Sequence, residues 1–367
     1  MNEITEKSSK PPDSPLGPKP KKRFFYLDFV RAFSVLLILL THFNNPFFTD
    51  GGWIITNHPF HIYVGDLGVS LFLMISGTAL TVTYRRPLDF KLFFKKRFLG
   101  IYPMFWIAYV VYFVLHILVY GLNSWQLPYR SFPLTIIAMD GLAANFGVPT
   151  MYLLGEWFLG FIVIFYLVFP LMLWGVQEHP WLTAAVGLGI YAAVVVLWQL
   201  HPLPYPPAVL LPFRVPELLF GIYFATYWKK VSPWGLLPAA GILIISVFCF
   251  ADVPKMLAVT LVGISAFTIL VFIGKYLEVW GVTQIVNWIS KYSYAIFLVH
   301  HVIIAEAFSH FPIQNLSQGG KYLAFVVLCL LSSLVGFVLY HVHRQVMSIV
   351  RRIRRHIKLD TKPKSDC

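Results

Sequence analysis

Charged side chains are scarce in this sequence. They make up 12% of its 367 residues, where soluble domains usually have about a quarter. Hydrophobic residues make up 58%, and the mean hydropathy is +0.70. This composition excludes a soluble globular domain. It predicts an all-α, polytopic membrane bundle of about ten transmembrane helices, which we expect in the cytoplasmic membrane.

Cysteine is also scarce, with three residues in the chain: Cys249, Cys329 and Cys367. Their wide spacing matches no metal-binding pattern, and an odd number cannot pair fully within one chain. We therefore expect neither a disulfide framework nor a bound metal.

The first twenty residues lack the apolar side chains that a folded core requires. They are rich in Pro, Ser and Lys, which predicts a disordered cytoplasmic tail over 1–20. We expect the membrane domain at 21–345 and a basic cytoplasmic tail at 346–367. Between the third and fourth spans, 121–150 is expected to be a loop carrying a short helix. The ten predicted spans lie at about 24–43, 62–82, 99–120, 152–174, 181–199, 208–228, 234–251, 256–274, 284–307 and 321–343.

The basic residues predict the orientation of these spans. With ten spans, 23 of the 29 Lys and Arg fall on the side of the N-terminus and three, Arg130, Lys255 and Lys321, on the other. Basic residues favour the cytoplasmic side, so both termini are expected there. This bias also accounts for most of the net charge of +13, so the lipid bilayer is an expected partner and nucleic acid is not.

The first span carries three polar residues that a simple anchor does not need: Asp28, Arg31 and His42. Eleven steps of 100° separate Arg31 from His42, so the two side chains share one helix face and lie about 16 Å apart along the axis. Asp28, three residues before Arg31, is close enough to pair with it. Ionisable residues inside a span indicate function, although a structural ion pair and an interfacial histidine are the plainer alternatives.

The ninth span holds two adjacent histidines, His300 and His301. Neighbouring helical side chains point about 100° apart, so we expect one of them to be a bystander. His300 is the functional candidate, and His301 is expected to be a packing residue.

Two further polar pairs are candidates for substrate contacts. Arg214 and Glu217 stand at the i,i+3 spacing of a helical ion pair, which fits a structural role equally well. Glu156 and Trp157 are expected at the outer membrane surface, where the indole also fits an aromatic belt.

The predicted loop from Arg85 to Arg97 is more basic than orientation alone requires, with six Lys or Arg in thirteen positions. Clustered basic side chains suit phosphate groups, and arginine offers a planar pair of donors. We therefore expect an anionic, phosphorylated ligand between this loop and Arg31. The loop residues considered for this contact are Arg85, Arg86, Lys95, Lys96 and Arg97.

These residues stand in segments that resemble the acyltransferase family 3 of integral membrane proteins. The four segments that carry the resemblance are LDFVRAFSVLLILLTH, GVSLFLMISG, FFKKRFLGIYPMFW and ISKYSYAIFLVHHVI. The arginine and histidine of the first segment, with ten residues between them, are its most specific feature. The chain departs from the family pattern at Gly100, where an arginine is frequent, and at Ile162, where a glutamate is frequent.

The resemblance implies transfer of an acyl group, usually acetyl from acetyl-CoA, to an extracytoplasmic or lipid-linked glycan. Arg31 and the basic loop would bind the CoA phosphates, with Asp28 orienting Arg31. His42 would act as general base or acyl carrier, since a histidine can accept a hydroxyl proton near neutral pH, and His300 would assist at the acceptor.

Two other classes of membrane protein share intramembrane Arg and His residues. A transporter or flippase for a sugar or lipid-linked glycan is the main alternative. A glycan polymerase is less favoured, because the predicted outer loops hold few basic residues.

Overall fold

The computed structural model describes residues 24–47, 51, 53–84, 87–121, 129–151, 153–154 and 157–360. Over these residues every regular element is helical and no strand occurs, so the all-α prediction is confirmed. Arg85, Arg86 and Glu156 lie outside the described residues, as does the predicted tail at 1–20.

Within the described part of the chain, eight helices are long and apolar enough to cross a bilayer. They are α1 (Phe25–Asn44), α2 (Val64–Thr83), α3 (Phe90–Tyr120), α6 (Trp157–Glu178), α7 (Pro180–Leu200), α10 (Lys255–Tyr276), α11 (Val282–His310) and α12 (Gln318–Asp360). The predicted sixth and seventh spans correspond to shorter elements: α8 (Val215–Tyr223), which continues into the π-helical turn η6 (Phe224–Trp228), and α9 (Pro233–Cys249). The protein is therefore an integral, multi-pass membrane protein.

The segment between α3 and α6 contains two short helices, α4 (Phe132–Ile136) and α5 (Asp140–Ala144), where one was predicted. The remaining elements are short 3₁₀ turns: η1 (Pro59–His61), η3 (Tyr129–Ser131), η4 (Pro207–Val209), η5 (Leu211–Arg214) and η7 (Ile313–Asn315).

The predicted basic loop is largely helical, which corrects the sequence-based interpretation. The Asp89 carboxylate accepts a hydrogen bond from the Leu92 amide at 3.0 Å and so caps the first turn of α3. The helix therefore begins at Phe90, about nine residues before the predicted span. As a result, Lys95, Lys96 and Arg97 project from a helix in three different directions.

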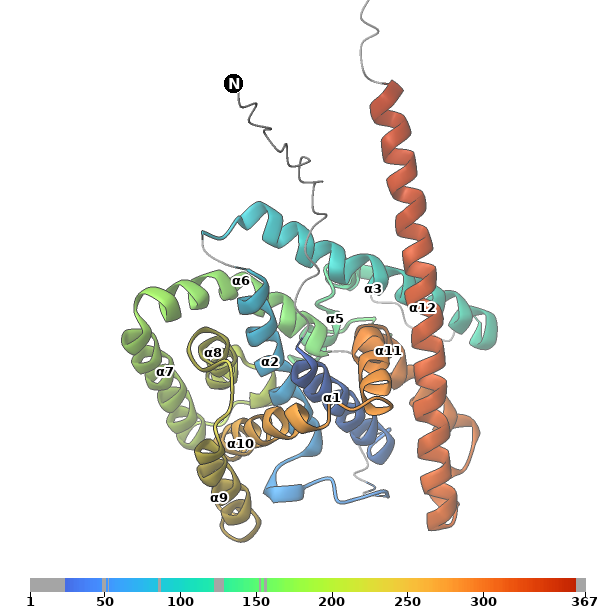
Figure 1. Ribbon diagram of the computed structural model, residues 1–367. Helices are drawn as coiled ribbons and strands as arrows, with labels where there is room; N and C mark the ends of the chain where they lie inside the picture. Colours follow the sequence, from blue (N-terminus) through green and yellow to red (C-terminus); the bar gives the residue numbers. More distant parts are fainter. Residues whose placement is uncertain are drawn as a thin grey trace, which may run out of the picture.

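Helix α1 lies near the middle of the bundle, where it packs against α2, α10 and α11 (Figure 1). Helix α12 stands at one side, beside α11 and α3, and its C-terminal part projects beyond the other helices (Figure 1). The central position of α1 explains why it is apolar around most of its circumference, with one polar stripe.

Helices α1 and α11 run in the same direction in matching register. Arg31 contacts Ser290 near the start of each helix, and His42 contacts His300 ten or eleven residues later on each. The polar stripe of α1 therefore faces α11 along its whole length.

Glycines allow α2 and α8 to approach closely. A Cβ added at Gly221 would lie 2.3 Å from the Met74 carbonyl oxygen, and one at Gly77 would lie 2.8 Å from the Leu218 carbonyl oxygen. Both contacts are too short for any side chain, so small residues set the spacing of these helices.

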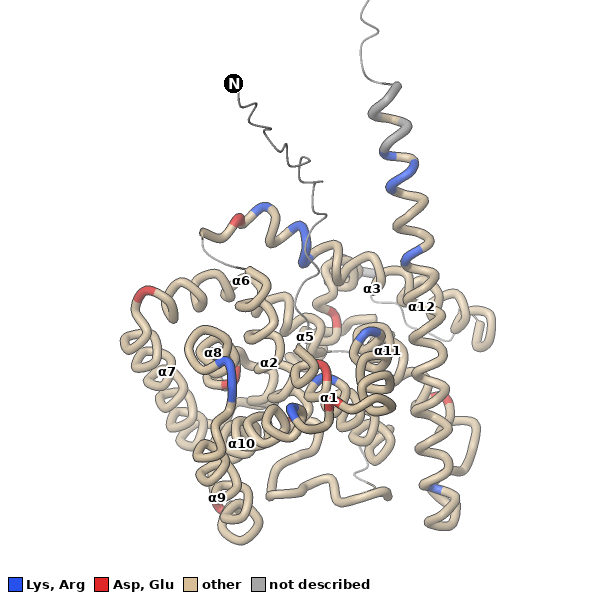
Figure 2. The backbone as a smooth tube through the Cα atoms, viewed as in Figure 1, with Lys and Arg blue, Asp and Glu red and all other residues tan. Residues whose placement is uncertain are grey.

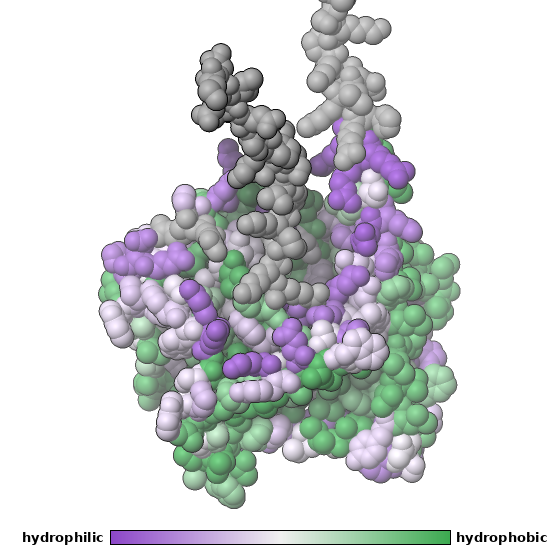
Figure 3. Space-filling view, viewed as in Figure 1, coloured by the Kyte–Doolittle hydropathy of each residue, from purple (hydrophilic) through white to green (hydrophobic). Residues whose placement is uncertain are grey.

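Polar residues gather toward one end of the molecule. Figure 2 shows Lys and Arg on the first turns of α3 and along the projecting part of α12. In Figure 3 hydrophilic side chains are concentrated near the same end, and hydrophobic side chains cover much of the remaining surface in that view. This distribution fits a bundle embedded in lipid.

Candidate active site

The predicted pair of Asp28 and Arg31 is present on α1 and gains a partner from α11. Arg31 Nη1 donates to Asp28 Oδ1 at 3.2 Å and to Ser290 Oγ at 3.0 Å. The Ser290 hydroxyl donates in turn to Asp28 Oδ1 in a short hydrogen bond. We call these three residues the cavity cluster, because Arg31 is 28% exposed and lines a cavity.

This cavity has a volume of about 270 Å³ and lies between α1, α2, α3, α6 and α11. Among the residues that line it, only Arg31 and Arg97 are charged. The lining consists of Arg31, Phe72, Ser76, Ala79, Leu80, Arg97, Gly100, Ile101, Phe158, Leu159, Ile162, Tyr166, Ser293, Tyr294 and Phe297. Two guanidinium groups without a lining carboxylate make the cavity suited to an anion.

Arg97 is held by aromatic rings. Its Nη2 donates to the Tyr84 hydroxyl at 3.1 Å, and its guanidinium lies 5.5 Å from the Tyr84 ring centroid and 5.7 Å from that of Tyr166. Its Nε is buried and has no hydrogen-bond partner in the part of the chain that the structure describes. An unsatisfied buried donor favours an acceptor from outside the protein.

The other basic residues of this segment lie differently. Lys96 places its ammonium 5.8 Å from the Tyr84 ring centroid but does not line the cavity, and Lys95 is exposed. Of the described members of the basic group, Arg97 alone therefore reaches the cavity beside Arg31.

Both residues that depart from the family pattern line this cavity. A Cβ added at Gly100 would meet nothing within 4 Å, so that position opens into free space. Ile162 contributes an apolar wall. Compared with the family pattern, the cavity thus lacks one basic and one acidic side chain.

His42 lies at the other end of the polar stripe, against both histidines of α11. Its ring centroid is 4.9 Å from that of His300 and 4.8 Å from that of His301. Both histidines of α11 therefore contact His42, whereas their angular separation predicts that one of them is a bystander. The 100° between the two side chains is divided on either side of the direction to α1, so both rings reach His42.

The hydrogen bond of His300 fixes its tautomer. Nδ1 lies 2.8 Å from the Phe297 carbonyl oxygen, which can only accept, so Nδ1 carries the proton and Nε2 holds the lone pair. His300 is buried, whereas His42 and His301 are partly exposed. The structure therefore brings the nitrogens of three imidazole rings close together within the bundle.

A small void lies between the cavity and the histidines. Its volume is about 10 Å³, and it is lined by Val35, Ile38, Leu39, Phe72, Ile296, Phe297 and His300. Phe72 and Phe297 also line the cavity that contains Arg31 and Arg97. These two rings therefore separate the arginine end of the site from the histidine end.

Arg214 and Glu217 form the predicted ion pair in a separate cluster. Arg214 is fully buried; its Nη1 lies 3.3 Å from Glu217 Oε1, and its Nη2 lies 2.8 Å from Asp66 Oδ1. The Ser70 hydroxyl accepts from Arg214 Nη1 at 3.2 Å and donates to Glu217 Oε1 at 3.2 Å. We call Asp66, Ser70, Arg214 and Glu217 the closed cluster.

The closed cluster does not join the candidate site. None of its four residues lines the cavity. The geometry favours the structural role over substrate contact. Trp157 begins α6 and packs against the rings of Phe158 and Phe161 without lining the cavity.

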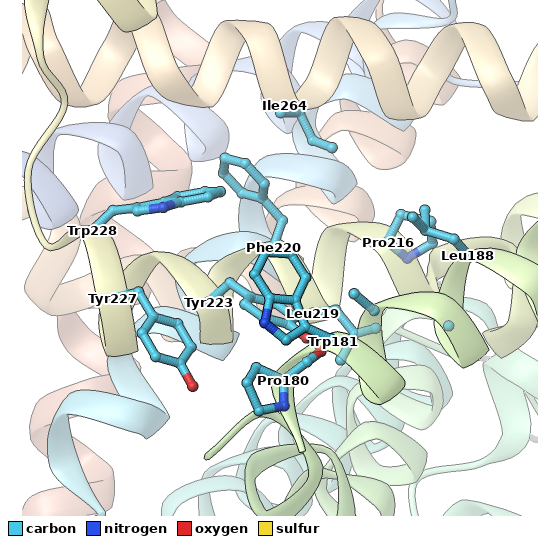
Figure 4. Close-up of a pocket in the computed structure, with 12 residues that line it drawn as sticks. Pro180, Trp181, Leu188, Pro216, Leu219, Phe220, Tyr223, Tyr227, Trp228 and Ile264 are labelled. Carbon is cyan, nitrogen blue, oxygen red and sulfur yellow. Dashed lines mark hydrogen bonds between the residues drawn. The ribbon is translucent and has the colours of Figure 1, made fainter. Parts of the chain in front are cut away.

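A second cavity lies away from these residues. It has a volume of about 500 Å³ between α7, α8 and α10 and includes Trp181, Phe220 and Trp228 (Figure 4). No charged residue lines it. Its lining is almost entirely apolar, and the hydroxyls of Tyr223 and Tyr227 already donate to the backbone carbonyls of Pro180 and Val176.

Sequence reasoning missed Ser290, Tyr84 and Tyr166. Ser290 stands in one of the four quoted segments, but its pairing with α1 depends on packing between residues far apart in the chain. The two tyrosines have no polar spacing that marks them, because they act through ring contacts with Arg97.

The site therefore combines an arginine-lined cavity with a group of histidines inside a multi-pass helical bundle. The family model of acyltransferase family 3, described as an acyltransferase domain, matches residues 24–342. The chain belongs to this family and is a membrane acyltransferase. No curated protein and no solved structure matches it.

Proposed function

We propose that the protein transfers an acetyl group from cytoplasmic acetyl-CoA to a hydroxyl of an extracytoplasmic or lipid-linked glycan. The observation that carries this proposal is the polar stripe of α1, with Arg31 in an anion-suited cavity at one end and His42 among histidines at the other. About 16 Å of helix axis separates them. CoA needs such a separation, since a long arm joins its phosphates to its thioester.

Arg31 and Arg97 bind the CoA phosphates in this proposal. They approach the cavity from different helices, α1 and α3, so a phosphate between them is held from two sides. Asp28 and Ser290 hold the Arg31 guanidinium toward the cavity. We place this end on the cytoplasmic side because the Lys and Arg residues of α3 and α12 gather near one end of the bundle (Figure 2).

His42 acts as general base on the acceptor. It takes the proton of the attacking hydroxyl as the new carbon–oxygen bond forms, and the carbon–sulfur bond of the thioester breaks. CoA then leaves as its thiolate and takes up the proton from His42, so atoms and charges balance. His300, fixed by its bond to the Phe297 carbonyl, keeps the His42 ring oriented toward the acceptor. An acyl-imidazole on His42 is the two-step alternative.

Glu156, Trp157, Arg214 and Glu217 stay as sequence-based proposals for acceptor contacts. The burial of Arg214 and Glu217 in the closed cluster argues against direct contact by those two. Trp157 begins α6, and an indole at the end of a span suits contact with a glycan at the membrane surface. Glu156 lies outside the described residues.

The test measures transfer of labelled acetyl from acetyl-CoA to surface glycan in membranes that contain the protein. We expect transfer with the wild type and near-complete loss with His42→Ala and with Arg31→Ala. His61→Ala and Arg130→Ala serve as matched controls, because both residues lie outside the cavity lining and the histidine group. Wild-type rates for both site variants would refute the proposal.

The same membranes also distinguish the proposed enzyme from a transporter or flippase. Such a protein moves its solute or lipid-linked glycan without consuming acetyl-CoA. Thermal stabilisation by acetyl-CoA supports the enzyme, because a ligand that binds only the folded state raises its apparent stability. Stabilisation by transported solutes alone would favour the alternative.

A further inference from the structure

The small void beside His300 lies where the acyl group of a bound donor would end. On α1 it is lined by Val35, Ile38 and Leu39, which follow Arg31 and precede His42. On α11 it is lined by Ile296, Phe297 and His300, in the parallel register of the two helices. The void is therefore on the line from the arginine cavity to His42.

The void is small and apolar. Its volume of about 10 Å³ is at the lower limit for one water molecule, which is close to the size of a methyl group. Its lining is hydrocarbon apart from the His300 ring, and His300 already donates through Nδ1 to the Phe297 carbonyl. A carboxylate placed here would be desolvated without a cationic partner in the lining.

The walls differ in how they are held. Val35, Leu39 and Ile296 are almost fully buried in one packed core between α1, α11 and α12. Phe72 and Phe297 are partly exposed and also line the cavity that contains Arg31 and Arg97. The Phe158 ring lies about 6 Å from each of them. The two rings can rotate to admit a donor arm, whereas the aliphatic walls are fixed by close packing.

We propose that Val35, Ile38, Leu39 and Ile296 form the acyl subsite of this enzyme and limit its donor to an uncharged two-carbon acyl thioester. This inference rests on the proposed function, because it assumes that the donor arm enters from the arginine cavity. Each extra methylene must displace a packed wall, and a dicarboxylic acyl group must bury its charge. One surplus methylene is typically worth about 10- to 200-fold in discrimination.

The chain offers a matched pair of variants on α1. Leu39 and Leu40 are adjacent and similarly buried. Leu39 lines the void, whereas Leu40 points about 100° away from it and packs in the core shared with α2 and α10. Leu39→Ala enlarges the subsite, and Leu40→Ala creates a comparable cavity elsewhere. Any general loss of stability affects both variants.

The experiment measures the dissociation constants of CoA, acetyl-CoA, butyryl-CoA and succinyl-CoA for the purified full-length protein. We expect the wild type to bind acetyl-CoA at least about tenfold more tightly than butyryl-CoA or succinyl-CoA. Leu39→Ala should bring the butyryl-CoA affinity to within about threefold of that for acetyl-CoA while still rejecting succinyl-CoA. Leu40→Ala should keep the wild-type ratio.

Two results separate the possible failures. Equal affinities of the wild type for all acyl donors, or an equal change in both leucine variants, overturn the acyl subsite and leave the proposed function intact. If neither CoA nor any thioester binds, the proposed function itself fails and the subsite with it.

Discussion

Two arginines inside the bundle share one local arrangement. In each case a carboxylate stands three residues from the arginine, and a serine from another helix accepts from the guanidinium and donates to that carboxylate. The two sets are Asp28, Arg31 and Ser290 in the cavity cluster and Arg214, Glu217 and Ser70 in the closed cluster. The shared spacing gives no hint of which set is functional.

The clusters differ in exposure and in the number of carboxylates. The Arg31 side chain is 28% exposed and lines a cavity, whereas Arg214 is fully buried and pairs with a second carboxylate, that of Asp66. Arg214 Nε also donates to the Ala208 carbonyl at 3.1 Å. An arginine whose donors all point to protein acceptors stabilises a fold, and one that faces a cavity can bind a ligand.

The largest effect is expected from removing the arginine of the closed cluster. Arg214→Met leaves Glu217 buried without its cation, and Asp66 keeps only the ammonium of the exposed Lys255, 3.6 Å away. Removing one partner of a buried ion pair typically costs about 3–5 kcal/mol. We expect loss of monodisperse protein in detergent and a strongly lowered melting temperature. Arg130→Met is the control, because Arg130 is exposed.

A second variant tests whether the cost comes from the unpaired charges. Arg214→Met combined with Asp66→Asn and Glu217→Gln removes all three charges together and should recover part of the folded yield. If Arg214→Met alone folds like the wild type, the structural role of the closed cluster is wrong.

The second-largest effect is expected from Arg31→Met, which should weaken acetyl-CoA binding. Asp28 keeps the hydrogen bond from the Ser290 hydroxyl, and this cluster holds one carboxylate where the closed cluster holds two, so the melting temperature should fall less than in Arg214→Met. Loss of charge-assisted hydrogen bonds to phosphate, about 1.5–3 kcal/mol, should weaken acetyl-CoA binding by about tenfold to a hundredfold. Titration of the purified protein with acetyl-CoA measures this change.

Arg31→Lys sharpens the result. Lysine keeps the charge but loses the planar pair of donors, so its affinity should fall between those of the wild type and Arg31→Met. An Arg31→Met protein that melts early but binds normally would reverse the roles of the two clusters.

The helix period accounts for what the sequence could predict here. Arg31 and His42 share a face because 100° per residue is a local property, and the same rule places Asp28 beside Arg31. Both predictions agree with the contacts in the structure. The helix period alone does not predict contacts between helices. It indicates that His300 and His301 point in different directions, yet both rings contact His42 on the neighbouring helix.

The basic segment before the third span shows what local spacing cannot supply. Its members were grouped by their closeness in sequence, yet α3 turns Lys95, Lys96 and Arg97 in different directions. Of the members that the structure describes, only Arg97 lines the cavity. Ser290 and Phe72 were missed because their roles depend on which helices pack together. Such packing follows from side-chain fit across the bundle, not from the composition of any one segment.

A smaller effect on acetyl-CoA affinity is expected from adding a negative charge to the cavity that contains Arg31 and Arg97. Gly100 lines the cavity, and a Cβ there would meet nothing within 4 Å, so side chains fit at this position. Gly100→Glu should weaken acetyl-CoA binding by roughly fivefold, about 1 kcal/mol, through repulsion of the phosphates. Gly100→Gln is the uncharged control and should bind like the wild type.

The close contact between α2 and α8 should not tolerate an added side chain. A Cβ at Gly221 would lie 2.3 Å from the Met74 carbonyl oxygen, so Gly221→Ala should lower the melting temperature without a specific effect on binding. Equal loss of affinity in Gly100→Glu and Gly100→Gln would show that the cavity responds to size and not to charge.

The smallest effects are expected at the two bridging serines, where the clusters are most alike. Ser290→Ala removes one of the hydrogen bonds that orient Arg31, but Asp28 Oδ1 still accepts from Arg31 Nη1. Affinity for acetyl-CoA should fall by roughly twofold, about 0.5 kcal/mol, with little change in melting temperature.

Ser70→Ala should show the opposite pattern. Ser70 is fully buried between Arg214 and Glu217, so its loss should cost about 1 kcal/mol of stability and leave acetyl-CoA affinity unchanged. Measuring melting temperature and affinity for both variants in one preparation decides the matter. If both serine variants lower the same quantity, whether melting temperature or affinity, then exposure to the cavity does not distinguish a binding arginine from a structural one in this bundle.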